Sequence, residues 1–282
     1  MMPANDRSLP HRLTSREFMQ ELPFRLFISP LTQRLEVHWH EFFEMGFVTM
    51  GEGEHVINGH SLSARKGMLF LLTPADFHEM IPAPGTTLVH YNLIFSDKLL
   101  DKELYRLLFA QYRKHLVCQL SEDEYGAIAA EFERIHREQE QITALESGRI
   151  VKGAIERLLI ELMRRSDLPE GASPLEQAQD QHEIGATIAF LRLHFREPLT
   201  LEAAAREAGL SSNYFSTRFR QYTGVTYQHF LQNLRLQFAS SLLQTSTLPI
   251  TEICFASGFR TLPHFERSFK QRFGVPPSKY RC

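Results

Sequence analysis

The sequence predicts an α+β chain, with an N-terminal β-barrel flanked by helices and a C-terminal all-α domain that holds two helix-turn-helix units. Three observations predict this class. Short aromatic and β-branched runs between Gly and Pro turns fill the first third of the chain, helical spacing of apolar residues follows, and one helical pattern then occurs twice. The expected domains are residues 1–165 and 183–282, joined by a linker at 166–182.

Composition and length fit a chain with two hydrophobic cores, since 43% of its 282 residues are hydrophobic. Met1–Arg16 has no apolar core of the kind found in leader peptides, and no stretch approaches the ~20 apolar residues of a membrane helix. The cysteines Cys118, Cys254 and Cys282 are scattered and odd in number, which argues against a disulfide framework. We therefore expect a cytoplasmic protein with no membrane partner.

Short strands account for the first part of the chain. They are expected at Phe24–Ser29, Phe42–Met50, His55–Ile57 and Thr86–Phe95, which are rich in Phe, Val, Ile and Tyr. The pair Asn58-Gly59 lies between two apolar runs and is a strong signal for a two-residue hairpin. Many short strands with frequent turns are typical of a small barrel or sandwich.

Helical patterns begin at about Asp97. Ser121 to Glu124 is an N-terminal cap pattern, and apolar residues follow it at three- and four-residue steps. A second amphipathic stretch runs from Ile150 to Leu162. These helices either cover the barrel or pair with a second chain, and a homodimer is the expectation from the second interpretation. Ser166–Gln181 is polar and contains Pro and Gly, which predicts the linker.

The last part of the chain repeats itself at a spacing of 50 residues. Each copy consists of a short helix, a turn with Gly209 or Gly258, and a second helix. The glycines suit a turn that needs a positive φ, and Thr200, Ser211 or Ser212, and Thr261 are candidate helix caps. The matching residues are Phe215, Phe219, Gly224 and Val225 in the first copy and Phe265, Phe269, Gly274 and Val275 in the second. Helix, turn and helix in this order are the helix-turn-helix pattern.

Helical geometry divides the second helix of each copy into two faces. Phe215, Phe219 and Tyr222 should be buried in the first copy, and Phe265, Phe269 and Phe273 in the second. The opposite faces carry side chains that hydrogen-bond base edges or neutralise phosphates. The candidate DNA-contacting residues are Asn213, Ser216, Thr217, Arg218, Arg220, Leu262, Pro263, Glu266, Arg267, Lys270 and Arg272. A solvated helix face is the alternative, but two copies joined by the helical segment Tyr227–Leu243 favour contact with DNA.

Charge supports this interpretation. From Glu183 to Cys282 there are 12 Lys and Arg residues against 6 Asp and Glu residues, whereas the rest of the chain is acidic. A basic part in a chain of net charge −2 is a hint of nucleic-acid binding.

Residues 183–282 resemble the DNA-binding domain of AraC/XylS-type regulators. The matching features are Ala204-Ala205, Gly209-Leu210-Ser211, Tyr214-Phe215, Phe219-Arg220, Thr223-Gly224, Leu234-Arg235, Ala239, Leu242-Leu243, Ile253, Gly258-Phe259, Phe265, Phe269-Lys270, Arg272 to Pro277 and Tyr280-Arg281. Cys254, Ser240 and Pro263 depart from the family pattern. The resemblance implies two reading helices held by one linking helix, double-stranded promoter DNA as partner, and transcription regulation, with activation the more frequent outcome and RNA polymerase a further partner.

A second resemblance covers about Phe24 to Phe95. His38 and His40 have the period-two spacing that points both rings to one side of a strand, and Glu44 and His78 follow. This arrangement resembles the cupin family, whose barrel forms the sensory half of many AraC/XylS-type regulators. It implies a small-molecule effector, a sugar or a metabolite, inside the barrel. The candidate effector-binding residues are His38, His40, Glu44, His78, His90 and Asn92, with Trp39 or Tyr91 near the rim.

Three interpretations of these polar residues stay open. They bind an organic effector, they bind a divalent metal such as Zn, Mn, Fe or Ni, or they are hydrogen-bonded core residues. No cofactor is required by the first interpretation. The second admits a metal-dependent cupin oxygenase or isomerase. The segment before His78 is shorter than in metal-binding cupins, and the chain has no GxSxG, P-loop or dinucleotide fingerprint, so we expect a regulator and not an enzyme.

Overall fold

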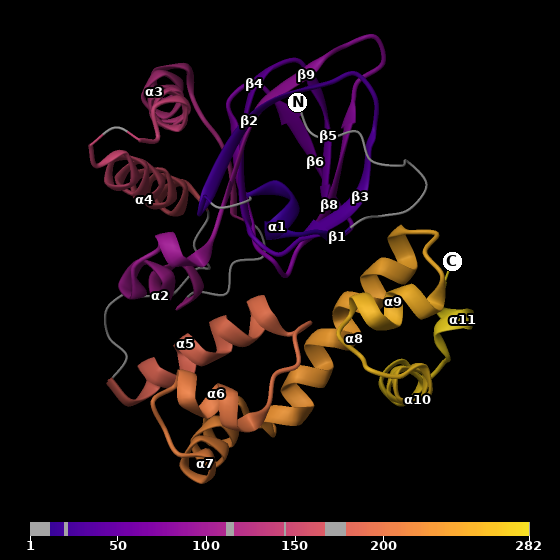
Figure 1. Ribbon diagram of the computed structural model, residues 1–282. Coiled ribbons are helices and arrows are strands. Elements are labelled where there is room, and N and C mark those ends of the chain that lie inside the picture. Colours follow the sequence, from indigo (N-terminus) through magenta and orange to yellow (C-terminus); the bar gives the residue numbers. More distant parts are fainter. Residues whose placement is uncertain (1–11, 20–21, 111–115, 144, 167–178, 282) are drawn as a thin grey trace. The chain divides into compact units, whose positions relative to one another are not determined.

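A computed structural model describes residues 12–19, 22–110, 116–143, 145–166 and 179–281 (Figure 1). The chain divides into two compact units, Met1–Ala172 and Ser173–Cys282. Most of the predicted linker, residues 167–178, lies outside the described residues. Residues 179–182, which we assigned to the linker, belong to the first helix of the second unit, because helix α5 spans Gln179–His194.

The first unit is built on two five-stranded sheets (Figure 1). One sheet has the order β1 (Arg12–Leu13), β3 (Leu35–His40), β8 (Phe77–Pro82), β5 (Glu52–Ile57) and β6 (His60–Arg65). The other has the order β10 (Leu116–Gln119), β7 (Met68–Leu72), β4 (Phe43–Met50), β9 (Leu88–Phe95) and β2 (Phe24–Leu31). Neighbouring strands are antiparallel except β1 and β3. The predicted all-β barrel or sandwich is therefore confirmed.

The hairpin between β5 and β6 turns at the predicted pair. Asn58 and Gly59 have φ values of 51° and 82°, as a type I′ turn requires at both central positions. The Asn58 side chain donates to Asp76 Oδ1 at 2.6 Å and accepts from the Phe77 backbone N–H at 3.1 Å. Local turn chemistry and contact with a third strand thus set the same register.

Helices α3 (Glu122–Glu140) and α4 (Ser147–Arg165) cover the outer face of the β4-containing sheet (Figure 1). The Phe132 ring stacks on the rings of Phe47 and Tyr91 at 5.4 Å in each case. Tyr91 therefore faces a helix, and its predicted place near the rim of the effector site is wrong. Strand alternation explains this, because its neighbours His90 and Asn92 point inward. The remaining elements of the unit are α1 (Ser15–Phe18), a 3-10 turn at Asp97–Leu99 and α2 (Lys102–Ala110).

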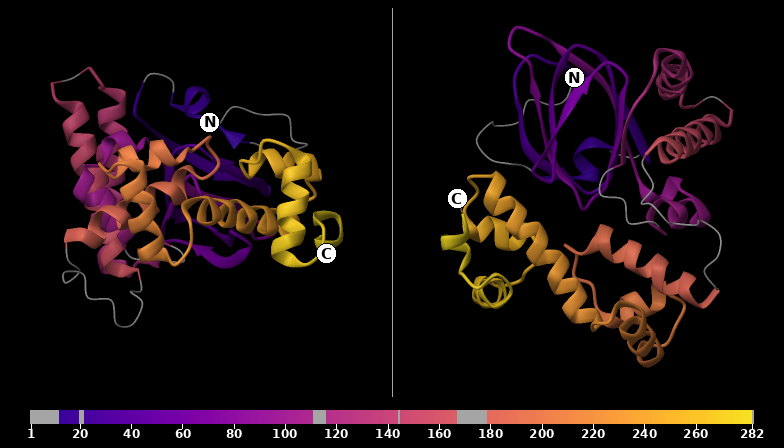
Figure 2. Two further views of the ribbon diagram at one scale, coloured as in Figure 1. Left: turned by 90° about the horizontal axis from the view of Figure 1, so that it is seen from below. Right: turned by 180° about the vertical axis from the view of Figure 1, so that it is seen from behind.

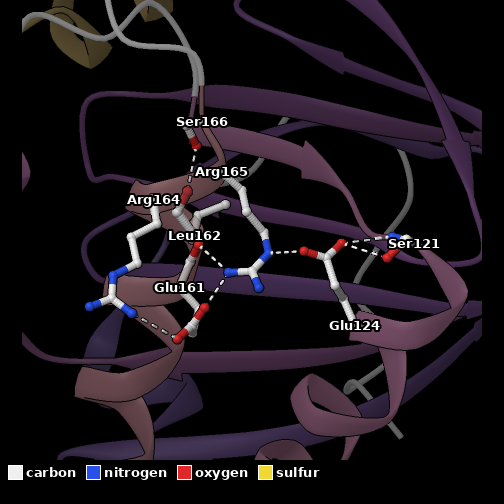
Figure 3. A network of polar contacts seen from close by, with 7 residues as sticks. All are labelled: Ser121, Glu124, Glu161, Leu162, Arg164, Arg165 and Ser166. Carbon is white, nitrogen blue, oxygen red and sulfur yellow. Dashed lines mark hydrogen bonds and ion pairs between the residues drawn. The ribbon is translucent and has the colours of Figure 1, made fainter.

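A polar network ties the end of α4 to the start of α3 (Figure 3). Arg165 Nε donates to Glu124 Oε1 at 2.8 Å, and a second guanidinium nitrogen contacts Glu161. Glu124 also accepts from the backbone N–H and the hydroxyl of Ser121, both at 2.9 Å, and the first of these bonds is one half of the predicted capping box. The pKa of Glu124 is lowered to about 2. The largest cause is the hydrogen bond from the Ser121 backbone N–H, and the Ser121 hydroxyl and Arg165 contribute less. This network holds the last turn of α4 where the described part of the unit ends.

Every element described in the second unit is a helix, and α8 (Tyr227–Thr245) connects its two halves (Figures 1 and 2). The first half contains α5, α6 (Leu201–Glu207) and α7 (Ser212–Thr223). The second half contains α9 (Ile250–Ala256), α10 (Leu262–Phe273) and α11 (Pro277–Tyr280). The two copies of the sequence repeat therefore form the two predicted helix-turn-helix units. No helix among the described residues is long and apolar enough to cross a membrane.

The predicted caps and turns of these units are mostly present. The hydroxyls of Thr200 and Ser211 accept from backbone N–H groups three residues on, and Gly209 and Gly258 have φ values of 68° and 82°. Thr261 occupies the N-cap of α10 but makes no side-chain capping bond, so this expectation is wrong. Pro263 removes one of the two possible donors, and the other, the His264 N–H three residues on, makes no bond to the Thr261 hydroxyl.

Aromatic side chains fill the core of each half. Phe215, Phe219, Phe265 and Phe269 are fully buried, as predicted. Tyr222 is 46% exposed, so the expectation that it is buried is wrong. The buried stripe of α7 advances in four-residue steps and therefore reaches Thr223, whose hydroxyl bonds the Phe219 carbonyl at 2.8 Å. Phe273 is only half-buried, although its ring packs on Phe269 at 4.5 Å.

Candidate functional site

The second helices of the two units, α7 and α10, present their polar faces to solvent, and we call them the reading helices. On α7, Asn213, Ser216, Thr217 and Arg220 are exposed and Arg218 is half-buried. On α10, Pro263, Glu266, Arg267, Lys270 and Arg272 are exposed and Leu262 is half-buried. Burial of the Phe residues on the opposite side holds these faces outward. The predicted DNA-contacting side chains are therefore grouped on two accessible helix faces.

Both reading helices lie beside α8 (Figure 1): α7 precedes its start, and α10 contacts its second turn through Gln232. With 19 residues, α8 is about 28 Å long. Successive major grooves on one face of B-DNA are about 34 Å apart. The length of α8 is thus comparable to this groove separation.

Several contacts orient the reading helices. Tyr227 Oη donates to the Thr200 carbonyl at 3.2 Å and joins the start of α8 to the first helix-turn-helix unit. Gln232 Nε2 donates to Ser268 Oγ at 2.8 Å and joins the second turn of α8 to α10. Arg218 lies over the Tyr214 ring at 6.0 Å, which places its charge beside the start of α7. The positively charged side chains of the two reading helices are thus carried by helices whose orientation is held by these contacts.

A second cluster of functional interest lies inside the first unit, between the two sheets. Strands β3, β5 and β8 of one sheet contribute histidines, and strands β4 and β9 of the other contribute a carboxyl, a histidine and an amide. All of these side chains are buried. They are His38, His40, His55, His78, Glu44, His90 and Asn92, and we call them the polar layer. All six predicted effector-binding residues belong to it.

Apolar clusters bound the polar layer along the strands. One contains Val48, Ile57 and Leu88 together with Phe70 and Met80. The other contains Phe18 and Met19 beside α1, with Phe42 and Ile94. Because successive inward positions of β4 and β9 run from one cluster through the polar layer to the other, the polar groups are shielded from solvent on both sides.

The geometry of the polar layer centres on Glu44 and His78. His78 Nδ1 is 3.0 Å from His55 Nε2, and His78 Nε2 is 3.8 Å from Glu44 Oε1. His40 Nε2 is 3.7 Å from Glu44 Oε2. Neither Glu44 Oε2 nor His78 Nε2 has a hydrogen-bond partner, although both atoms are buried. Buried polar atoms without partners are costly, and a ligand that met them would remove this cost.

Burial shifts the ionisation of these groups toward their neutral forms. It raises the pKa of Glu44 to about 8, against a smaller lowering by a hydrogen bond from Asn92. It lowers the pKa of His90 to about 4 and that of His78 well below 6.5. These three groups of the polar layer are therefore mostly neutral at pH 7.

Sequence reasoning missed His55. Its ring lies 4.3 Å from the Phe70 ring and bonds His78, although the two histidines are 23 residues apart. The available signal was strand alternation, since His55 and the buried Ile57 share one face of β5. Trp39 lies between the inward-pointing His38 and His40, so strand alternation directs it away from the polar layer.

Part of the polar layer could hold a metal ion. One ligand atom each from His38, Glu44 and His78 lies within 4.8 Å of the others. Imidazole nitrogen and carboxylate oxygen are ligands that Zn, Mn, Fe and Ni accept, and Glu44 and His78 each have a buried side-chain atom without a hydrogen-bond partner. Binding would require Glu44 to lose its proton, so affinity would rise with pH.

Comparisons with known proteins agree with this division of the chain. Residues 24–163 match the model of an AraC-like ligand binding domain, and residues 204–282 match that of a helix-turn-helix domain. The chain is 28% identical over 248 residues to the HTH-type transcriptional activator RhaS of Escherichia fergusonii, with 86% of each chain covered. It is 26% identical over 249 residues to the HTH-type transcriptional activator RhaR of Pectobacterium carotovorum, with 87% of this chain and 85% of the relative covered. Among solved structures, fatty acid-bound ToxT of Vibrio cholerae is 14% identical, with a TM-score of 0.41, covering 91% of this chain and 94% of ToxT.

Proposed function

This chain belongs to the AraC family of transcription regulators, and from this premise we propose that it activates transcription when a small molecule binds within its barrel. The relatives named as activators support the direction of regulation. The observation that carries the DNA-binding part is the pair of exposed reading faces, each backed by buried phenylalanines. A repeat that served only for packing would not need two such faces.

The proposed DNA contacts follow from side-chain chemistry. Asn213 suits adenine, Arg267 suits guanine and Glu266 suits cytosine, because each matches the hydrogen-bonding edge of that base. Arg218, Arg220, Lys270 and Arg272 neutralise phosphates.

Binding to DNA from the region upstream of its own reading frame, measured against salt concentration, tests this function. We expect Arg267→Ala to cost about 1–3 kcal/mol on the preferred site and to relax specificity at one base pair. Arg220→Ala should weaken binding to all sequences alike and reduce the salt dependence. Identical behaviour of the two variants across a random-site library would contradict the assignment of the faces. Absence of salt-sensitive binding to any fragment would remove the function itself.

We place the effector in the polar layer, in contact with His38, His40, Glu44, His78, His90 and Asn92, and add His55 to this set. Convergent polar groups among apolar walls are typical of small-molecule sites. The neutral forms of Glu44, His78 and His90 suit a neutral ligand with both donors and acceptors, such as a sugar or a similar metabolite. A metabolite panel in a thermal-shift assay, repeated with Glu44→Gln and Asn92→Leu, tests this site. A ligand that stabilises all three proteins equally binds elsewhere.

Metal-dependent catalysis is the second candidate function, and the His38, Glu44 and His78 group is the observation that favours it. These residues would hold the ion, which would supply Lewis-acid chemistry when bound. Elemental analysis of the purified protein separates the candidates, because an enzyme of this kind needs stoichiometric metal. We favour the regulator without catalysis, with metal as an alternative effector.

The proposed function also implies an oligomeric state, a protein partner and a location. We propose a homodimer, for which Ile150 and Ile160 on α4, each 38% exposed, are available. A dimer would bind two sites with increased overall affinity, and sedimentation at micromolar concentration tests it. RNA polymerase as a partner and a cytoplasmic location follow from activation at promoters.

A further inference from the structure

We propose that the two helix-turn-helix units are locked together by a junction between the turn at Gly258 and the backbone at Arg196, and that this junction sets the spacing of the reading helices. The inference rests on the DNA-binding function above. It identifies Gly258 and Arg235 as positioning residues, which act on specificity without touching DNA.

Close backbone approach at Gly258 is the first observation. A Cβ added there would lie 2.7 Å from Arg196 Cα and 2.8 Å from the Arg196 carbonyl oxygen, distances that real Cβ atoms do not show. Gly209, the equivalent glycine of the first unit, has a positive φ as well, but no atom lies within 4 Å of its added Cβ. Both turns need glycine for their φ, and only the second needs it for contact. The two copies of the repeat therefore differ, because only the turn at Gly258 packs closely against another part of the backbone.

The Arg196 segment is itself anchored to α8. Arg235 Nε donates to the Phe195 carbonyl at 2.7 Å, and Arg235 Nη2 donates to the Glu197 carbonyl at 2.8 Å. The rings of Phe195 and Phe238 pack at 5.4 Å, and the Arg196 guanidinium lies 5.2 Å from the centre of the Phe238 ring. The loop after α5 belongs to the first helix-turn-helix unit. These contacts hold it in place, and the turn of the second helix-turn-helix unit packs against it.

A second contact restrains α10 itself. Gln232 on α8 donates to the buried Ser268 hydroxyl of α10 at 2.8 Å. The turn at Gly258 packs against Arg196, and α10 is bonded to Gln232. The second helix-turn-helix unit therefore has no freedom to rotate about the end of α8. The reading helices therefore meet DNA as one body with a single spacing.

Spacing on DNA is the property that such a body would select. One base pair inserted between the two recognised segments moves the second by about 3.4 Å and turns it by about 35° around the duplex axis. Units that moved independently would follow this displacement. Locked units would lose the contacts of one reading helix.

The experiment uses the full chain and a duplex selected by it from a random library. Affinities are measured for that duplex and for derivatives with one or two base pairs inserted or deleted between the two segments, for wild type, Gly258→Ala and Gly209→Ala. We expect wild type and Gly209→Ala to share one sharp optimum, with about tenfold or greater loss at each altered spacing. Gly258→Ala should bind the selected duplex at least about tenfold more weakly and discriminate less between spacings.

Arg235→Met covers the case in which Gly258→Ala does not fold. It removes both carbonyl contacts of the Arg196 segment, keeps an apolar stem, and should also flatten the spacing profile. Profiles of Gly258→Ala or Arg235→Met that coincide with that of Gly209→Ala would overturn the junction. Failure of wild type to select any duplex would instead reject DNA binding, so the two failures are distinguishable.

Discussion

Glu44 should make the stability of the barrel fall as pH rises through neutrality. Burial raises its pKa to about 8, against 4.5 for an ordinary glutamate. Above pH 4.5 the folded barrel keeps a proton on Glu44 that the unfolded chain releases. The resulting contribution to stability is therefore complete below pH 4.5 and lost as pH rises to about 8. Replacement by glutamine, which has the same shape and no charge, should remove this dependence.

The magnitude follows from the neighbouring histidines. The lowered pKa values of His78 and His90 act in the opposite direction below pH 6.5, where their unfolded forms take up protons. At pH 6.5 the unfolded forms of these two rings are half protonated, and by pH 8 they are neutral in both states, so they offset part of the Glu44 effect; they do so equally in wild type and in Glu44→Gln. The window from pH 6.5 to about 8 is about 1.5 pH units wide, and each unit corresponds to about 1.4 kcal/mol, so wild type should lose about 2 kcal/mol relative to Glu44→Gln.

The single tryptophan of the chain provides the assay. Trp39 is buried on β3 between two residues of the polar layer, so its fluorescence reports unfolding of the barrel and not of the helical unit. Urea unfolding is followed at pH 6.5, 7.25 and 8 with a chelator present, because a bound metal would ionise Glu44. Wild type and Glu44→Gln profiles that run parallel across this window would refute the reasoning.

Other variants test the packing and the turns. Phe219→Ala should destabilise the first helix-turn-helix unit by about 3–5 kcal/mol, since the ring is fully buried against Phe230 at 5.4 Å. Thermal unfolding followed by helical circular dichroism measures this, and a curve that coincides with that of wild type contradicts it. Gly59→Ala should cost about 1–2 kcal/mol, because φ is 82° there; urea unfolding followed by Trp39 measures it, and a neutral effect would mean that the turn tolerates a side chain. Arg157→Met removes two hydrogen bonds to Glu131, at 2.9 and 2.8 Å, yet should cost under about 1 kcal/mol because the arginine is largely exposed; a larger loss in the same unfolding assay would reveal a structural role for this pair.

The helical half was largely readable from the chain because its information is local. The spacing of Phe215 and Phe219, and of Phe265 and Phe269, determined which face of each helix is buried. Local reasoning was wrong at Tyr222 and at the cap of α10, where the ends of the helices depart from ideal periodicity. The error at Tyr222 is one position along the helix, the distance by which a four-residue step differs from a three-residue one.

The barrel interior was readable only in part. Strand alternation grouped His38 with His40, and turn chemistry at Asn58 and Gly59 set one hairpin. Which strands face each other across the interior depends on long-range pairing, which no local pattern encodes.

By itself, the sequence determined the family, the order of the two units, the paired reading faces and most of the polar layer. The reading faces are carried by residues close in the chain and by the repeat, and the polar layer by strand alternation together with the family resemblance. Only the tertiary structure decided that His55 joins His78, that Tyr91 faces a helix, and that Gly258 rests on Arg196. Those contacts join residues 20 or more positions apart in the chain, and their geometry comes from sheet pairing and helix packing, which act through space and leave no periodic mark on the sequence.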